Sequence, residues 1–105
     1  MFLHKIRSNQ CMTLDKLYQI IEDRRENMPV GSYVASLFRD GTDRIIQKVG
    51  EEAIEVIIAS KNEDKKNITL EVADLIFHVL VLLSSFGIST KAILKELGER
   101  DRQPK

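Results

Sequence analysis

The sequence has one cysteine, two prolines and five glycines in 105 residues, and its formal net charge is zero. Its single thiol, Cys11, excludes an internal disulfide and fits a reducing, cytoplasmic setting. The basic residues are scattered along the chain, whereas a nucleic-acid-binding groove needs them clustered. We therefore expect neither a disulfide scaffold nor a nucleic-acid partner.

Long apolar runs are also missing. The longest, Leu75 to Leu83, is interrupted by His78 and falls well short of the roughly 20 residues that span a bilayer. Residues 1–11 contain no apolar stretch long enough for a signal peptide. We expect these residues to form an N-terminal tail, with Met12 as an alternative start, ahead of a single domain at 12–105 and no membrane contact.

Because helix-breaking residues are few and no alternating strand pattern occurs, the chain is predicted to be all-α. Apolar periodicity places helices at 14–26, 33–39, 42–60, 65–85 and 90–100. The expected N-caps are Thr13, Ser32 and Ser89.

Two glycines have predicted roles in these helices. Gly41 is expected to end the second helix in the left-handed conformation. Gly50 lies inside the third helix, where it costs about 1 kcal/mol relative to alanine. It either allows close approach of a neighbour or is a local weakness.

The fourth helix is unusually apolar. From Val72 to Leu83, every residue is apolar except Asp74 and His78, so nearly the whole circumference needs cover. The other helices of one chain are too few and too short to supply it. We therefore expect four to five helices in a bundle that is completed by a second copy, as a dimer or higher oligomer.

Four carboxylates repeat one spacing in this region: Glu52 with Glu55, and Glu71 with Asp74. Residues three apart lie on one face of a helix. The polar stretch 60–65 predicts a turn, so an antiparallel helix pair would bring both acid pairs face to face. Clustered hard oxygen ligands suit Mg²⁺ or Mn²⁺ better than Zn²⁺.

The same acids have a second interpretation as a structural ion network. Carboxylates in an apolar segment are costly unless they are paired, protonated or bound to metal. Lys48 and Arg44 are available as partners, and Lys48 either pairs with Glu52 or contacts a phosphate. Glu51 projects about 100° from its neighbour and is either an outer partner of the site or a surface acid.

Other chemistries lack their motifs. The sequence has no GxxxxGKS/T loop, no GxGxxG and no HExxH. A single histidine is more often a hydrogen-bonded core residue than a ligand, and no second histidine is placed to complete a zinc site beside His78. With Cys11 and His4 both in the expected tail, a Cys–His nucleophile is unsupported.

The segments 48–61 (KVGEEAIEVIIASK) and 71–83 (EVADLIFHVLVLL) together resemble the phosphoribosyl-ATP pyrophosphatases of histidine biosynthesis. These enzymes are all-α, MazG-like nucleotide pyrophosphohydrolases with an ExxE, spacer, ExxD metal pattern. The resemblance spans roughly residues 14–100. It implies hydrolysis of 1-(5-phosphoribosyl)-ATP to 1-(5-phosphoribosyl)-AMP and pyrophosphate, the second step of the pathway.

The resemblance and the chemistry of phosphoanhydride hydrolysis together predict roles for individual residues. The metal ligands would be Glu52, Glu55, Glu71 and Asp74. The acid that accepts the proton of the attacking water would be Glu51 or Glu55. The residues that contact phosphates would be Lys48, with Arg44 or Lys61.

Two other functions fit the same residues. A MazG-type housekeeping enzyme acting on noncanonical nucleoside triphosphates would share the carboxylates but differ in its base pocket. A non-catalytic helical dimerisation module would use the acids only in salt bridges. Substrate assays separate the first alternative, and titration with Mg²⁺ or Mn²⁺ separates the second.

Overall fold

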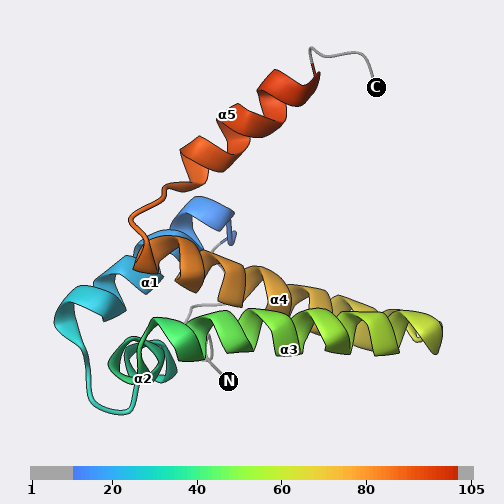
Figure 1. Cartoon of the computed structure of the whole chain (residues 1–105), viewed down its shortest axis with the longest axis horizontal. Coiled ribbons are helices and arrows are strands. Elements are labelled where there is room, and N and C mark those ends of the chain that lie inside the picture. The colour runs from blue at the N-terminus through green and yellow to red at the C-terminus, as the bar shows by residue number, and fades with distance from the viewer. Residues whose placement is uncertain (1–10, 102–105) are drawn as a thin grey trace.

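The computed structural model describes residues 11–101, and this part of the chain forms five helices and no strand (Figure 1). The helices are α1 (Leu14–Asn27), α2 (Tyr33–Asp40), α3 (Thr42–Lys61), α4 (Lys65–Ser85) and α5 (Thr90–Asp101). The all-α prediction is confirmed, and each expected helix agrees with the structure to within one residue at either end. The expected tail lies outside the described residues except for Cys11, which is exposed.

Local side-chain caps explain where the helices begin. Thr13, Ser32 and Ser89 each accept a hydrogen bond from the backbone N–H three residues later, at 3.1–3.2 Å, as predicted. Asp64 does the same for α4 through its Oδ1 atom, at 3.2 Å. Asp64 belongs to the stretch predicted as a turn, and an aspartate before a helix is a common cap.

The junction between α2 and α3 corrects one prediction. Gly41 has φ 103° and ψ 174°, so its φ is positive but it is not in the left-handed helical region that was expected. The reason is that Gly41 is the single residue between two helices, so the change of chain direction from α2 to α3 falls on this one residue. Glycine is needed there because other residues rarely adopt this conformation.

The hydrophobic core lies at one end of the molecule, where α1 and α2 pack against the first turn of α3 and the C-terminal half of α4. It is built from apolar residues that are at most 6% exposed: Leu17, Ile21, Val34, Leu37, Ile45, Phe77, Leu80 and Val81. The core anchors one end of α3 and α4 and leaves their other ends free.

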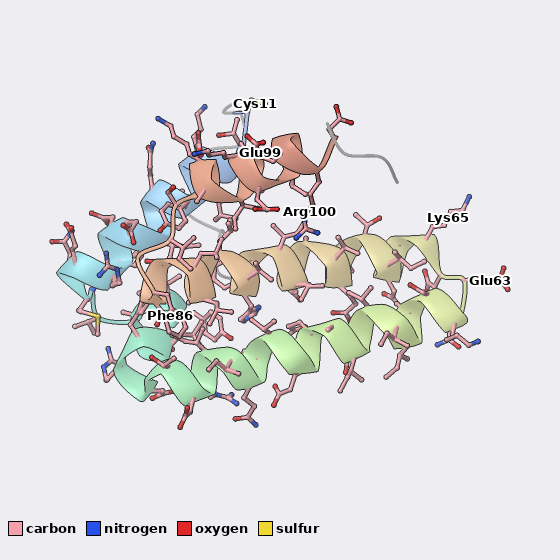
Figure 2. All side chains as sticks on the ribbon, turned by 45° about the horizontal axis from the view of Figure 1, so that its top comes forward. Cys11, Glu63, Lys65, Phe86, Glu99 and Arg100 are labelled. Carbon is pink, nitrogen blue, oxygen red and sulfur yellow. The ribbon has the colours of Figure 1, made fainter. Side chains whose placement is uncertain are left out.

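Helices α3 and α4 form a long antiparallel hairpin that extends away from this core (Figure 1). Its tip lies at Glu63 and Lys65, and Phe86 lies at the opposite end of α4 (Figure 2). Towards the tip, four aliphatic side chains of the hairpin are about half exposed: Ile54, Ile57, Ile58 and Leu70. A two-helix arm with this much exposed apolar surface lacks the cover that helices ordinarily find in a bundle.

Helix α4 is long and apolar enough to cross a membrane, judged by length and composition alone, and core helices of soluble proteins meet the same criterion. This differs from the prediction based on the shorter apolar run from Leu75 to Leu83. The 18-residue apolar window of α4 is only 28% buried in the single chain. Most of this apolar segment is therefore exposed in the described part of the single chain.

Substitution of Gly50 by alanine tests whether another helix packs closely against α3 at this position. A Cβ atom at this position would meet nothing within 4 Å in the described part of the chain. We therefore expect Gly50→Ala to raise the free energy of unfolding by about 1 kcal/mol, because alanine favours the helix and meets no obstacle. Urea denaturation measures this, and a loss of stability would instead reveal a second molecule packed at Gly50.

Candidate functional site

The α3–α4 hairpin fixes the position of each of the four acids along the helix axes. Glu52 lies eleven residues before Glu63 at the tip, and Asp74 lies eleven residues after it. Glu55 and Glu71 lie eight residues before and eight after. Because α3 and α4 run antiparallel with the same rise per residue, each acid of α3 lies at nearly the same height as an acid of α4.

Three of the four acids come within coordinating distance of one another. Carboxylate oxygens of Glu52, Glu71 and Asp74 all lie within 4.8 Å of each other, and all three side chains are partly buried. Glu55 is exposed and lies outside this group of three, although its charge still acts on Glu71. The structure therefore brings together one acid of the first predicted pair and both acids of the second.

Repulsion within this acid cluster of Glu52, Glu71 and Asp74 has a direct electrostatic consequence. Partial burial and the Glu52 carboxylate raise the pKa of Asp74, and His78 and Lys48 only partly oppose this rise. Desolvation, followed by the charges of Glu55, Glu52 and Asp74, raises the pKa of Glu71. Both groups therefore hold their negative charge at a cost in the metal-free protein.

The nearby cations compensate this charge unevenly. Lys48 Nζ lies 3.4 Å from Glu52 and 3.3 Å from Glu51, and Arg44 lies 3.9 Å from Glu51. Within residues 11–101, neither Glu71 nor Asp74 forms an ion pair. The structural ion network that the sequence allowed therefore accounts for Glu52 but includes neither acid of α4 within residues 11–101.

This donor set fits a hard divalent cation. It offers carboxylate oxygens only, from two rigid helices, and it lacks the His and Cys ligands that zinc prefers. A divalent ion would also remove the repulsion that raises the two pKa values. The residues present thus match Mg²⁺ or Mn²⁺ on chemistry and on charge.

Lys48 is well placed to stay positively charged beside the cluster. Burial lowers the pKa of its ammonium group, but Tyr33, Glu51 and Glu52 raise the pKa by more, so it ends above its ordinary value. Its side chain is 17% exposed, so part of it still reaches solvent. Lys48 can therefore neutralise Glu52 and still meet an anion that enters the site.

The remaining predicted residues differ in their distance from the cluster. Glu51 accepts a hydrogen bond from Gln47 Nε2 at 2.9 Å in addition to its contacts with the two cations, so its partners all lie on α3. Lys61 is the last residue of α3, nine residues beyond Glu52, or roughly 13 Å along the helix axis. The structure does not bring Lys61 to the cluster.

The structure also shows two residues that the sequence reasoning left out of the site. His78 is 3% exposed and lies one turn after Asp74, and the Tyr33 hydroxyl lies 2.9 Å from its Nε2 atom. The helical spacing from Asp74 to His78 was visible in the sequence. Tyr33 could not be placed, because only the packing of α2 against α4 brings it to His78.

The whole helical region, residues 14–101, matches a protein-family model described as phosphoribosyl-ATP pyrophosphohydrolase. The chain belongs to the phosphoribosyl-ATP pyrophosphohydrolase family. The match includes all four acids and the three basic residues predicted for the site. The family resemblance carried by residues 48–61 and 71–83 is therefore confirmed.

Individual members of this family are similar over most of their length. A Leptospira biflexa protein named phosphoribosyl-ATP pyrophosphatase is 54% identical over 85 residues, which are 81% of this chain and 92% of that protein. Proteins with the same name from Clostridium acetobutylicum and Pelotomaculum thermopropionicum are each 49% identical. Those alignments cover 86% and 85% of this chain, and 82% and 90% of the two relatives.

Proposed function

We propose that this protein hydrolyses 1-(5-phosphoribosyl)-ATP to 1-(5-phosphoribosyl)-AMP and pyrophosphate, in the second step of histidine biosynthesis. Family membership supports the substrate, and the names of the relatives agree with it. The observation that carries the chemistry is the set of three carboxylates, from two helices, within 4.8 Å of one another. Pyrophosphate release from a triphosphate needs charge neutralisation at this kind of site.

Glu52, Glu71 and Asp74 would hold Mg²⁺ or Mn²⁺, and Glu55, whose charge acts on Glu71, stays the fourth predicted ligand. When bound, the ion neutralises charge on phosphate oxygens and lowers the pKa of bound water. Glu55 is exposed and forms no ion pair within residues 11–101, so it is free to accept the proton of the attacking water. Glu51 remains the second choice for this role, since cations already surround it.

Lys48 and Arg44 would contact the phosphates of the substrate. Both lie on the side of α3 that leads to Glu52, and both are tied to Glu51, which holds their charges near one another. Lys61 stays a predicted phosphate contact at the far end of α3. A bound substrate would have to extend along the helix to reach it.

We further propose that two copies associate, in the cytoplasm, through the groove between α1, α4 and α5. The groove has a volume of about 600 Å³, and its walls are almost entirely apolar. Every residue of α5 except Thr90 is exposed. An isolated helix of this length is only marginally stable in water, so α5 needs a packing partner. A second copy supplies matching apolar helices and would cover both α5 and the outer face of α4.

The direct test is to measure pyrophosphate release by the purified protein with Mg²⁺. We expect rapid turnover of 1-(5-phosphoribosyl)-ATP and slow turnover of ATP, dTTP and deaminated nucleoside triphosphates. Faster turnover of the triphosphates would favour the housekeeping activity. The acid cluster is common to both functions, so only the substrate panel distinguishes them.

A metal titration tests the non-catalytic alternative. Calorimetry with Mg²⁺ or Mn²⁺ should show binding, and thermal melting should shift upward with added metal. A module whose acids serve only in salt bridges would show neither effect. The repulsion that raises the pKa values of Glu71 and Asp74 favours metal binding.

A further inference from the structure

Three aromatic rings lie directly beside the acid cluster, between α2 and α4. The Phe77 and His78 rings meet edge to face, with centroids 4.9 Å apart. The Tyr33 ring stacks on Phe77 at 6.1 Å and meets His78 edge to face at 5.8 Å. Phe77 and His78 are buried, whereas Tyr33 is 39% exposed and closes the group towards solvent.

The donors and acceptors of the two hydrogen bonds that link Tyr33, His78 and Asp74 follow from the chemistry of the groups. His78 Nδ1 lies 2.7 Å from the backbone carbonyl of Asp74, and a carbonyl can only accept, so Nδ1 carries the hydrogen. In the neutral ring, a hydrogen on Nδ1 leaves Nε2 with a lone pair and no hydrogen. The Tyr33 hydroxyl therefore donates to His78 Nε2, at 2.9 Å.

Two consecutive hydrogen bonds thus connect the Tyr33 hydroxyl, through the His78 ring, to the backbone carbonyl of Asp74. Burial raises the pKa of the Tyr33 phenol above its ordinary value, despite the opposing charges of Lys48 and Arg44, so the hydroxyl keeps the proton that it donates. The Asp74 carbonyl accepts this side-chain bond with its second lone pair while still serving the helix. The turn of α4 that carries Asp74 is in this way tied to the first residue of α2.

We propose that Tyr33 is a positioning residue for Asp74, acting through His78 to hold the Asp74 carboxylate opposite Glu52. Groups that orient a ligand without touching the metal typically contribute about 10- to 100-fold to metal affinity or activity. Tyr33 does not touch the acids, so its contribution depends on the hydrogen-bonded path. This inference rests on the proposed hydrolysis and deepens it.

The test is Tyr33→Phe, which keeps the ring stack and removes only the hydroxyl. We expect kcat to fall by about 10-fold or more and Mn²⁺ affinity to fall with it, while KM changes little, since Asp74 is displaced but the phosphate contacts remain. The matched control is Tyr18→Phe. The Tyr18 hydroxyl also donates one hydrogen bond, to the Ile88 carbonyl at 2.7 Å, away from the acids.

Tyr18→Phe should lose stability without changing kcat or Mn²⁺ affinity. Equal losses of kcat and affinity in both variants, or no loss in Tyr33→Phe, would overturn the proposal. Mn²⁺ affinity is measured by calorimetry and needs no turnover. A loss of affinity in Tyr33→Phe therefore supports the positioning role even if the wild-type protein proves inactive on the proposed substrate.

Nitrogen-15 NMR of the His78 ring tests which ring nitrogen carries the proton, and so which way the Tyr33–His78 hydrogen bond is donated, with Tyr33 unchanged. The chain has two histidines, so a His4→Gln background leaves His78 as the only ring signal. We expect the proton on Nδ1, with Tyr33→Phe shifting mainly the Nε2 resonance. A proton found on Nε2 instead would overturn the proposal, and this measurement does not require any Tyr33 variant to fold.

Discussion

Asp74→Asn should lower kcat by at least about 100-fold, the upper end of the loss seen when a group that only orients a metal ligand is changed. Asp74 is one of the three acids whose oxygens lie within 4.8 Å of one another. Asparagine keeps the shape of the side chain and removes its charge, so the site loses electrostatic attraction for the cation. The measurement is pyrophosphate release at saturating substrate and Mg²⁺.

The same substitution should stabilise the metal-free protein at neutral pH. The folded-state pKa of Asp74 lies above its ordinary value of 3.8, so the unfolded chain releases this proton at lower pH than the folded one. The stabilising contribution of this group is therefore complete below about pH 3.8 and is lost as pH rises through the raised folded-state pKa. Asparagine has no ionisable carboxyl group, so the Asp74→Asn variant does not lose this contribution to stability as the pH rises.

Urea denaturation in EDTA from about pH 4 to about pH 8 measures the effect as the difference between wild type and variant. We expect Asp74→Asn to be the more stable protein at the upper end of this range. Added Mg²⁺ should reverse the order, since only the wild type gains strongly from the ion. Equal stability in EDTA at every pH would contradict the repulsion inferred here.

A matched control separates this effect from a general change in charge. Glu26→Gln removes one negative charge from an exposed position on α1, away from the hairpin. It should leave kcat unchanged and alter the pH dependence of stability very little. Near-normal turnover in Asp74→Asn would remove Asp74 from the mechanism.

Leu94→Glu should convert the proposed two-chain assembly into single chains of 12.0 kDa. Leu94 lines the groove between α1, α4 and α5 and is 60% exposed in one chain, so a charge there costs little until a second copy covers it. Once it is covered, an unpaired carboxylate costs several kcal/mol. Light scattering after size exclusion measures the mass directly.

The variant should also unfold at lower urea concentration, because α5 and the outer face of α4 lose their cover. Val30→Glu is the matched control, since Val30 is fully exposed in the loop between α1 and α2 and does not line the groove. It should keep both the mass and the stability of the wild type. A wild-type protein that is monomeric at micromolar concentration, or a Leu94→Glu protein that still pairs, would rule out this groove as the interface.

The helices could be predicted from the sequence because their signals are local. Thr13, Ser32 and Ser89 cap helix starts with bonds to residues only three positions away. The pairing of the acids could be predicted for a related reason. A short turn between two long helices leaves little freedom in their register, and the acids lie at equal distances from its tip.

Only the tertiary structure determines which of the site residues come into contact. The rotation of α3 and α4 about their own axes brings Glu52, Glu71 and Asp74 within 4.8 Å and leaves Glu55 exposed. The packing of α2 against α4 places the Tyr33 hydroxyl on His78, across 45 positions of sequence. The sequence determined the helices and the chemical nature of the site, because caps and spacings act within a few residues. The coordinating set and its supporting hydrogen bonds depend on contacts between distant helices, which no local pattern specifies.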